Sequence, residues 1–183
     1  FAYEYDVEKN IELILDFYPD TKHIAFISDN SYGGVSLQAL VKEEMREKYP
    51  DLDLILLDGR KHTVYSITEK ISTLPEKTAI LLGTWRVDKN DGYFMRNATY
   101  SMMMTNPGLP AFTVTSIGMG YWATGGRVPE YRTVGKDIAR LVIGLENQSD
   151  SVLSEQGLQI IPNQYCFDYE KLRKGNFLNK EVA

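Results

Sequence analysis

The sequence predicts an α/β fold in which a doubly wound, mostly parallel sheet is flanked by helices. Short apolar runs rich in β-branched residues alternate along the chain with segments whose apolar residues recur at helical spacing. The apolar runs are continuous, which is typical of parallel strands that are buried on both faces. Because ligands of such sheets bind beyond the carboxyl ends of the strands, the loops that follow the strands are the candidate site.

The four central strands are expected at the continuous apolar runs, namely His23–Ser28, Asp53–Leu57, Thr78–Leu82 and Ala111–Thr115. The tail is expected to contain one or two further short strands and then a polar helix or coil, the strands being Gln159–Ile161 and Tyr165–Phe167. The loops at the carboxyl ends of the central strands are therefore Asp29–Gly34, Asp58–His62, Thr84–Asn90 and Ser116–Trp122.

The helices between these strands show both apolar periodicity and end signals. Asp6 is placed to cap the first helix, which Pro19 ends. Thr63 is placed to cap the third helix, which stops before Pro75. Helical spacing places the helices near residues 7–18, 37–45, 64–71, 93–104 and 131–146. The last helix has the most regular apolar stripe, formed by Val134, Ile138, Leu141, Val142 and Leu145.

We interpret residues 1–183 as a single α/β lobe. The only boundary that the composition suggests is the polar stretch 147–157, which is either a linker or a surface loop, so residues 147–183 form a candidate crossover or tail segment. The chain begins with Phe1 rather than Met, so we expect it to be an excised piece of a longer protein. No apolar run approaches the roughly 20 residues that span a bilayer.

The composition is that of a soluble globular protein. Hydrophobic residues make up 43% and charged residues 25% of the chain, and the net charge is −5 without a basic stripe, so we expect no nucleic-acid partner. His23 and His62 lack neighbouring metal-ligand patterns, so neither a metal nor another cofactor is expected. The single cysteine, Cys166, cannot form an internal disulfide and is expected to be a small core residue.

Several catalytic signatures are absent from the sequence. It contains neither a G-x-x-x-x-G-K-[ST] phosphate loop nor a G-x-S-x-G nucleophile elbow. A phosphorylated receiver domain would need clustered acids after the first strand and an aspartate after the third strand. Asp29 has no acidic neighbour, and the third strand leads into Gly83, Thr84 and Trp85. No catalytic residue is therefore assigned.

Residues 118–123 match the G-x-G-x-x-A pattern of dinucleotide-binding sites. Such a site requires the glycines to open a helix whose N-terminus faces the pyrophosphate. Here Gly125, Gly126 and Pro129 follow, and these residues do not propagate a helix. We therefore favour a flexible loop that carries Tyr121 and Trp122. Their rings either stack on a ligand, fill a hinge or fill the edge of the domain.

The candidate binding residues lie in the strand-end loops. Asn30, Ser31 and Tyr32 stand at the start of a helix whose first N–H groups are free to bind an anionic or polar group. Asn30 or Ser31 can equally cap that helix, whereas Tyr32 has no evident local role. Arg86 can hold a carboxylate with two hydrogen bonds and Trp85 can stack on a ring, although a surface ion pair explains Arg86 as well.

The order of several segments resembles the second lobe of type I periplasmic-binding-protein-like domains. These segments are DVEKNIELILDFYPDTKHIAFISDNSYGG at residues 6–34, LPAFTVTSIGMGYWATGG at 109–126, VGKDIARLVIGLEN at 134–147 and NQYCFDYEKLRKGNF at 163–177. The sequence looks closest to ABC-type solute-binding proteins and to the extracytoplasmic sensor domains of bacterial histidine kinases. The similarity extends over about residues 5–178.

The resemblance implies that the chain holds only one side of the family's cleft, because the ligand lies between two lobes and the first lobe would precede Phe1. The segment after Gly126 can cross back towards that lobe. The resemblance implies that seven positions face the cleft, and we add Arg86 because of its chemistry. The candidate ligand-binding residues are therefore Asn30, Ser31, Tyr32, Thr84, Trp85, Arg86, Ser116 and Tyr121.

The expected function is non-catalytic ligand binding by the extracytoplasmic sensing region of a membrane receptor, with a histidine kinase of a two-component system as the first candidate. A solute-binding protein of an ABC transporter and a small nucleotide-binding α/β enzyme are the alternatives. The expected partner is a small molecule. The resemblance implies a periplasmic or extracytoplasmic location, with the membrane reached only through the parent protein. A surface left open by a missing lobe would favour a homodimer.

Overall fold

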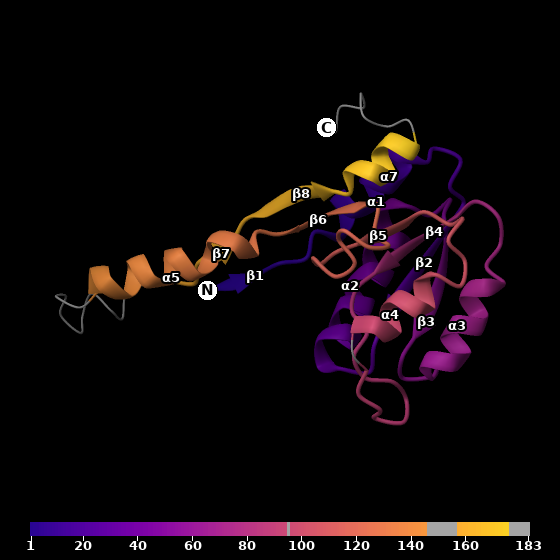
Figure 1. The fold of residues 1–183 in the computed structure, drawn as a ribbon, viewed down its shortest axis with the longest axis horizontal. Helices are drawn as coiled ribbons and strands as arrows, with labels where there is room; N and C mark the ends of the chain where they lie inside the picture. The colour runs from indigo at the N-terminus through magenta and orange to yellow at the C-terminus, as the bar shows by residue number, and fades with distance from the viewer. Residues whose placement is uncertain (95, 146–156, 176–183) are drawn as a thin grey trace.

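The structure is a computed structural model, which describes residues 1–94, 96–145 and 157–175. Its main sheet has six strands in the order β3-β2-β4-β5-β6-β8. Every neighbouring pair is parallel except β6 and β8, which are antiparallel. The predicted α/β class with a mostly parallel sheet is confirmed (Figure 1). The strands are β2 (His23–Ser28), β3 (Asp53–Asp58), β4 (Thr78–Leu82), β5 (Ala111–Thr113), β6 (Gly125–Pro129) and β8 (Asn163–Phe167).

Helices cover both faces of this sheet, and successive residues of β2 show why. Ile24 and Phe26 belong to a core that includes residues of α1 (Val7–Phe17) and α2 (Tyr32–Lys48). Ala25 and Ile27 belong to a second core that includes residues of α3 (Val64–Ser72) and α4 (Arg96–Met103). Because side chains alternate along a strand, one continuous apolar run fills both cores.

The helix starts agree with the predicted caps. The Asp6 side chain accepts a hydrogen bond from the N–H of Lys9 at 3.1 Å. The Thr63 hydroxyl accepts one from the N–H of Ser66 at 3.2 Å, with the reciprocal bond of a capping box. Each cap satisfies a first-turn N–H that has no intrahelical partner, so it fixes where the helix begins.

The segment from Gly125 to Pro129 differs from the expectation. It was expected to continue a flexible loop, but it forms strand β6, and β5 ends at Thr113 instead of Thr115. A Cβ atom on Gly126 would lie 2.0 Å from the backbone oxygen of Thr113, so only glycine allows this close approach. The glycines that argue against a helix here permit a tightly packed strand.

A second sheet and a helix project from the main sheet (Figure 1). The short strand β1 (Ala2–Tyr3) pairs in parallel with β7 (Ile160–Ile161), and α5 (Tyr131–Leu145) extends beside them. We call β1, β7 and α5 the arm, and we call the main sheet with α1 to α4 and α7 (Tyr169–Lys174) the body. The helix expected at residues 131–146 therefore forms in the arm. Except for Gly157, the stretch 147–157 lies outside the described residues.

Hydrogen bonds fix the point where the arm leaves the body. The buried side chain of Asn10 in α1 accepts from the N–H of Arg127 and donates to its carbonyl, both at 2.9 Å. Arg127 also forms an ion pair with Asp6 at 2.7 Å. The Asn163 amide donates to the carbonyl of Glu4 at 3.1 Å, which joins the segment after β1 to the start of β8. Three separate chain segments thus connect arm and body.

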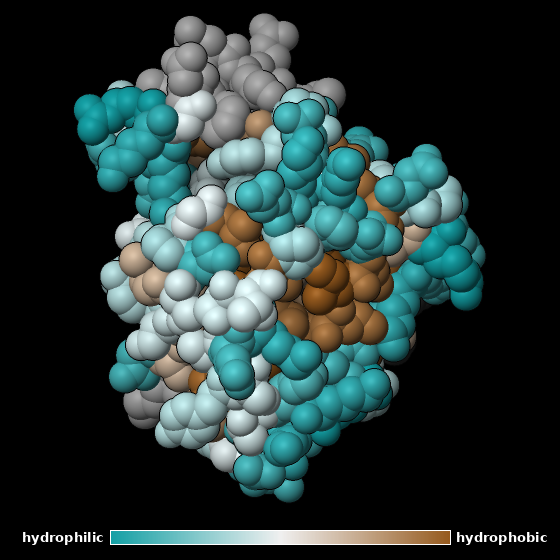
Figure 2. Space-filling model, turned by 90° about the vertical axis from the view of Figure 1, so that its right-hand side faces the viewer, coloured by the Kyte–Doolittle hydropathy of each residue, from teal (hydrophilic) through white to brown (hydrophobic). Residues whose placement is uncertain are grey.

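The centre of the body lies at β2 and β4. All residues of β4 are buried, whereas the edge strand β3 has an exposed start and three half-buried residues. On the side opposite the arm, a mainly hydrophilic surface surrounds an apolar area near its middle (Figure 2). The almost fully buried strands β2 and β4 therefore end at loops that were predicted to form the site.

Candidate functional site

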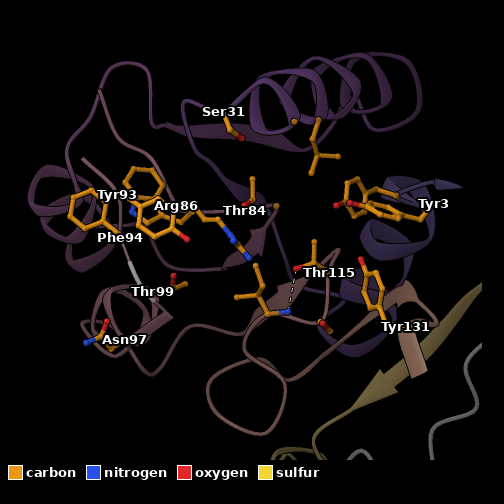
Figure 3. A pocket seen from close by; sticks show the side chains of 17 residues that line it. Tyr3, Ser31, Thr84, Arg86, Tyr93, Phe94, Asn97, Thr99, Thr115 and Tyr131 are labelled. Atoms are coloured by element: carbon orange, nitrogen blue, oxygen red, sulfur yellow. Dashed lines mark hydrogen bonds between the residues drawn. The ribbon is translucent and has the colours of Figure 1, made fainter. Parts of the chain in front are cut away.

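A cavity of about 880 Å³ opens at the carboxyl ends of β2, β4 and β5, beside the root of the arm (Figure 3). The start of α2 and the loops after β4 and β5 line it from the body, and Tyr3 and Tyr131 line it from the arm. Strand order reverses here, because β3 lies on one side of β2 and β4 on the other. Open α/β sheets bind their ligands in the crevice at such a reversal.

Asp29, the residue after β2, ties two of the lining loops together. Its carboxylate is 1% exposed and accepts hydrogen bonds from the N–H of Ser31 at 3.0 Å and its hydroxyl at 2.5 Å. The same carboxylate accepts from the Thr84 hydroxyl at 3.3 Å and from the N–H of Arg86 at 2.9 Å. Three predicted site residues on two loops are therefore held in a fixed relation by one buried group.

Ser31 caps α2, as the capping alternative foresees, and it also lines the cavity. Its hydroxyl accepts a hydrogen bond from the N–H of Gly34 at 3.1 Å. The first i to i−4 bond of this helix runs from Val35 to Ser31, so the N–H groups before Val35 have no intrahelical partner, and Ser31 caps only that of Gly34. Gly33 lines the cavity next to Ser31, which places the positive end of α2 at the cavity wall.

Arg86 extends into the cavity from the loop after β4. Its guanidinium lies between Thr84 and Thr115 in Figure 3. The backbone of Arg86 is held on both sides, because its N–H donates to Asp29 and its carbonyl accepts from the N–H of Phe94 at 2.7 Å. The ion pairs found among the described residues do not include Arg86. The surface ion pair considered for Arg86 is thus not formed within the described residues.

Trp85 lies deeper than its neighbour. Its side chain is 2% exposed and belongs to the core between the sheet and helices α3 and α4, while it also borders the cavity. Its indole N–H is buried and has no acceptor among the described residues. A buried donor without a partner costs about 1–3 kcal/mol, so an acceptor brought by water or a ligand would be stabilising.

Aromatic side chains stand at two opposite sides of the cavity (Figure 3). Tyr93 and Phe94 lie on one side, and the tyrosines of the arm root lie on the other. There, the ring of Tyr3 contacts those of Tyr5 and Tyr131 edge-on, with centroids 5.4 and 5.8 Å apart. Burial raises the pKa of Tyr5, and the neighbouring phenols raise it further, so the Tyr5 hydroxyl is neutral at physiological pH.

Ser116 lines the cavity as well, while the remaining predicted residues lie elsewhere. The N–H of Asn30 donates to the carbonyl of Val87 at 2.9 Å, so this residue braces the loop after β4. Tyr32 begins α2 and its side chain is 90% exposed, outside the cavity lining. Tyr121 is 73% exposed and borders a separate, smaller cavity of about 390 Å³. The structure thus brings together Ser31, Thr84, Trp85, Arg86 and Ser116.

Several lining residues were not selected from the sequence. Thr115 directly precedes Ser116, and its position near a strand end could have identified it. Tyr93 and Asn97 fall within the helix expected near residues 93–104, which gave no reason to select them for the site. Tyr3 and Tyr131 reach the cavity because the chain returns from the arm, and no local pattern in the sequence signals that return. The other lining residues outside the predicted set are Tyr5, Gly33, Leu37, Gly83, Phe94, Thr99 and Ile117.

The loop that matches a dinucleotide fingerprint does not open a helix. The N–H groups of Tyr121, Trp122 and Ala123 all donate to the carbonyl of Gly118, at 3.0–3.1 Å. These donors are used within the loop and do not face a phosphate. Gly118 has φ of +89°, and a Cβ there would lie 2.3 Å from the ring of Trp122. Glycine is therefore needed for packing against the indole.

The titratable groups outside the cavity give no metal site. Among the described residues, no group of three or more His, Cys, Asp and Glu side chains is arranged to hold a metal ion. Burial lowers the pKa of His62, which stands before α3 and lies 3.4 Å from the Ser66 hydroxyl. Cys166 is half-buried in β8, and burial raises the pKa of its thiol.

None of the described helices is both long enough and apolar enough to span a membrane.

The sequence matches no known family model, and no curated protein is significantly similar to it. Solved structures do match. The ligand-free, open form of CD0873, a substrate-binding protein with adhesive properties from Clostridium difficile, has a TM-score of 0.69 at 15% identity. A conserved domain protein from Vibrio cholerae has a TM-score of 0.62 at 16% identity. The ABC domain in complex with L-Trp from Streptococcus pneumoniae has a TM-score of 0.62 at 11% identity.

This chain shares a fold with the matched part of each of these three chains. The alignments cover 96%, 98% and 93% of it but only 57%, 58% and 55% of those three chains, so it spans little more than half their length. At these identities the likeness concerns the fold alone. The descriptions of two of these proteins mention substrate binding and a complex with L-Trp, respectively.

Proposed function

We propose that this chain is the ligand-binding second lobe of a two-lobed, extracytoplasmic binding protein, without a catalytic role. The observation that carries the proposal is the cavity at the strand ends, because body and arm line it jointly. Its described lining combines hydroxyl groups, aromatic rings and one guanidinium, which suits recognition of a small molecule. The description of one neighbour as a substrate-binding protein and of another as bound to L-Trp supports this role.

The arm supports a first lobe on the other side of the cavity. A two-stranded sheet such as β1 and β7 is marginally stable by itself. The apolar stripe of α5 is exposed, with Ile138 at 40% and Val142 at 56%. The matching chains have additional length, since this chain spans 55–58% of each. Within the proposal, the stripe packs on a lobe that precedes Phe1, and the ligand lies between the two lobes. Without that lobe the stripe would favour a homodimer.

Ligand binding then acts through closure of the two lobes. A ligand that contacts both sides stabilises the closed state only by its higher affinity for that state. The three connections between arm and body are where such a motion would be accommodated, and the bonds of Asn10 to Arg127 hold one of them. Closure would move the arm, and with it the segments that continue the chain.

Two biological roles are consistent with this mechanism. Delivery of a solute to an ABC transporter is favoured by the described functions of the structural neighbours. Sensing for a histidine kinase, through a parent protein tethered to the inner membrane, rests on the resemblance of NQYCFDYEKLRKGNF to the tail of sensor domains. The gene separates them, because a membrane span and kinase domain after Ala183 support the sensor and a stop codon supports the free binding protein.

Binding is tested by a thermal-shift screen of amino acids, organic acids, sugars, nucleobases and short peptides on the full polypeptide that contains these residues. A ligand at 100 times its dissociation constant should stabilise the protein by about 2.7 kcal/mol. Thr84→Val should weaken binding, while Thr68→Val in α3 should not, because Thr68 lies outside the cavity lining. Stabilisation by NAD(P) or ATP alone, or by no compound, would contradict the proposal.

A further inference from the structure

The charges around the cavity indicate which class of ligand it takes. Among the described residues that line it, Arg86 is the only charged side chain, and the others are hydroxyl, amide, aromatic, aliphatic or glycine residues. Resting on the proposed binding function, we infer that the ligand is an organic acid with one carboxylate, an aromatic ring and no ammonium group.

The first step of the argument is the position of Arg86. Its backbone is held at 2.9 Å to Asp29 and 2.7 Å to Phe94, so the root of the side chain is fixed while the guanidinium reaches into the cavity (Figure 3). A guanidinium presents paired N–H donors that match the two oxygens of a carboxylate. No acid among the described residues forms an ion pair with it.

The second step is the field from the protein backbone. The N-terminus of α2 reaches the cavity wall at Ser31 and Gly33, and its partial positive charge adds to that of Arg86. The buried indole N–H of Trp85 is a further donor without an acceptor among the described residues. Arg86 and the N-terminus of α2 therefore both favour a negatively charged or acceptor group in the cavity.

The third step concerns what the cavity lacks for an amino acid. The described cavity lining contains no carboxylate that could pair with the ammonium group of an amino acid. Moving that charged group from water into the cavity without a counter-charge would cost free energy. The nearest acid in this network, Asp29, is 1% exposed and already accepts bonds from Ser31, Thr84 and Arg86. It is therefore not available to an ammonium group.

The fourth step is the placement of the aromatic residues. Tyr93 and Phe94 lie on one side of the Arg86 guanidinium, and Tyr3 and Tyr131 lie on the other (Figure 3). A ligand whose carboxylate meets Arg86 can therefore place a ring against an aromatic wall. The tyrosines at the arm root pack edge-on against one another, so they form a joined aromatic wall on that side of the cavity.

The test uses three molecules with one ring and different charges: 3-(4-hydroxyphenyl)propionate, tyrosine and tyramine. Calorimetry on the full polypeptide should show that the propionate binds at least about tenfold more tightly than tyrosine, with tyramine weakest, since a charged hydrogen bond corresponds to about a tenfold or larger change. Arg86→Gln should weaken propionate binding by about tenfold or more. The matched variant Lys89→Gln, on the same loop but outside the cavity lining, should leave it unchanged.

Each other outcome has a distinct meaning. Equal or tighter binding of tyrosine or tyramine, or propionate binding that is insensitive to Arg86→Gln, would overturn the inferred ligand class and leave the binding function standing. The same holds if none of the three binds while a sugar or nucleobase stabilises the protein in the screen. If no compound in the screen binds, the binding function itself is wrong, and the ligand class falls with it.

Discussion

Helices α1 and α5 have similar amphipathic sequences and opposite surroundings. Most apolar residues of α1 are buried, and Ile11 and Ile14 are fully enclosed in the core on one face of the sheet. The corresponding stripe of α5 is exposed at Ile138 and Val142, and the helix extends away from the body (Figure 1). An amphipathic pattern therefore shows that a helix has a surface to cover, but it does not show where that surface is. Matched substitutions in the arm and in the body can test this difference in surroundings.

The largest expected contrast is between matched isoleucines. Ile11→Ala removes a side chain that is 0% exposed and should lower the free energy of unfolding by about 3 kcal/mol, through lost burial and the cavity left behind. Ile138→Ala, at a side chain 40% exposed, should change it by about 0.5 kcal/mol or less when these 183 residues are studied alone. Urea unfolding measures both. A loss of about 3 kcal/mol for Ile138→Ala would show that α5 is packed in solution and would remove the contrast.

The next contrast is between matched glycines. Gly126→Ala would place a Cβ atom 2.0 Å from the Thr113 carbonyl, so β6 must shift, and the free energy of unfolding should fall by about 2 kcal/mol. Gly144→Ala has no atom within 4 Å of the new Cβ and should stabilise α5 by up to about 1 kcal/mol. Circular dichroism should show slightly more helix for Gly144→Ala. Equal effects of the two variants on the free energy of unfolding would indicate that β6 at Gly126 has as much room for a methyl group as α5 has at Gly144.

Local signals in the sequence predict most elements of both regions, including α5 of the arm. The body follows from local signals: continuous apolar runs locate β2 and β4, and Asp6 and Thr63 locate helix starts. Ser31, Thr84 and Arg86 line the same cavity, as expected for loops that follow parallel strands, because the carboxyl ends of such strands lie at one edge of the sheet. These predictions succeed where neighbouring residues in the sequence determine the outcome.

Prediction fails where distant segments meet. Tyr3 and Tyr131 line one cavity although they are far apart in the sequence, because β1 and α5 return to the same point. The glycines of β6 were expected in a loop, since their close approach to Thr113 is a tertiary contact. Tyr32 was expected in the site, but it is the first residue of α2, directly after the capping residue Ser31, and its side chain is exposed to solvent.

The smallest contrast is electrostatic and separates two ion pairs. In the body, Asp58 lies 2.8 Å from Arg60, which in turn donates to Gln38 at 2.6 Å. In the arm, Asp137 and Arg140 lie 3.5 Å apart with side chains 44% and 79% exposed. Burial by itself would raise the pKa of Asp58, but hydrogen bonds and the charge of Arg60 outweigh it, and this pKa lies below its usual value.

A carboxylate with a depressed folded-state pKa stabilises the fold above its unfolded pKa, near 4, and this contribution is lost as the pH falls through the folded-state value. Asp58→Asn should therefore lower the free energy of unfolding by about 1 kcal/mol at pH 7, and the difference from wild type should shrink between pH 5 and pH 3. Asp137→Asn should change it by a few tenths of a kcal/mol, because an exposed pair is screened by water. Urea titrations across this pH range decide the matter: a difference for Asp58→Asn that grows on acidification would mean that Arg60 does not hold the charged form of Asp58 in the folded body.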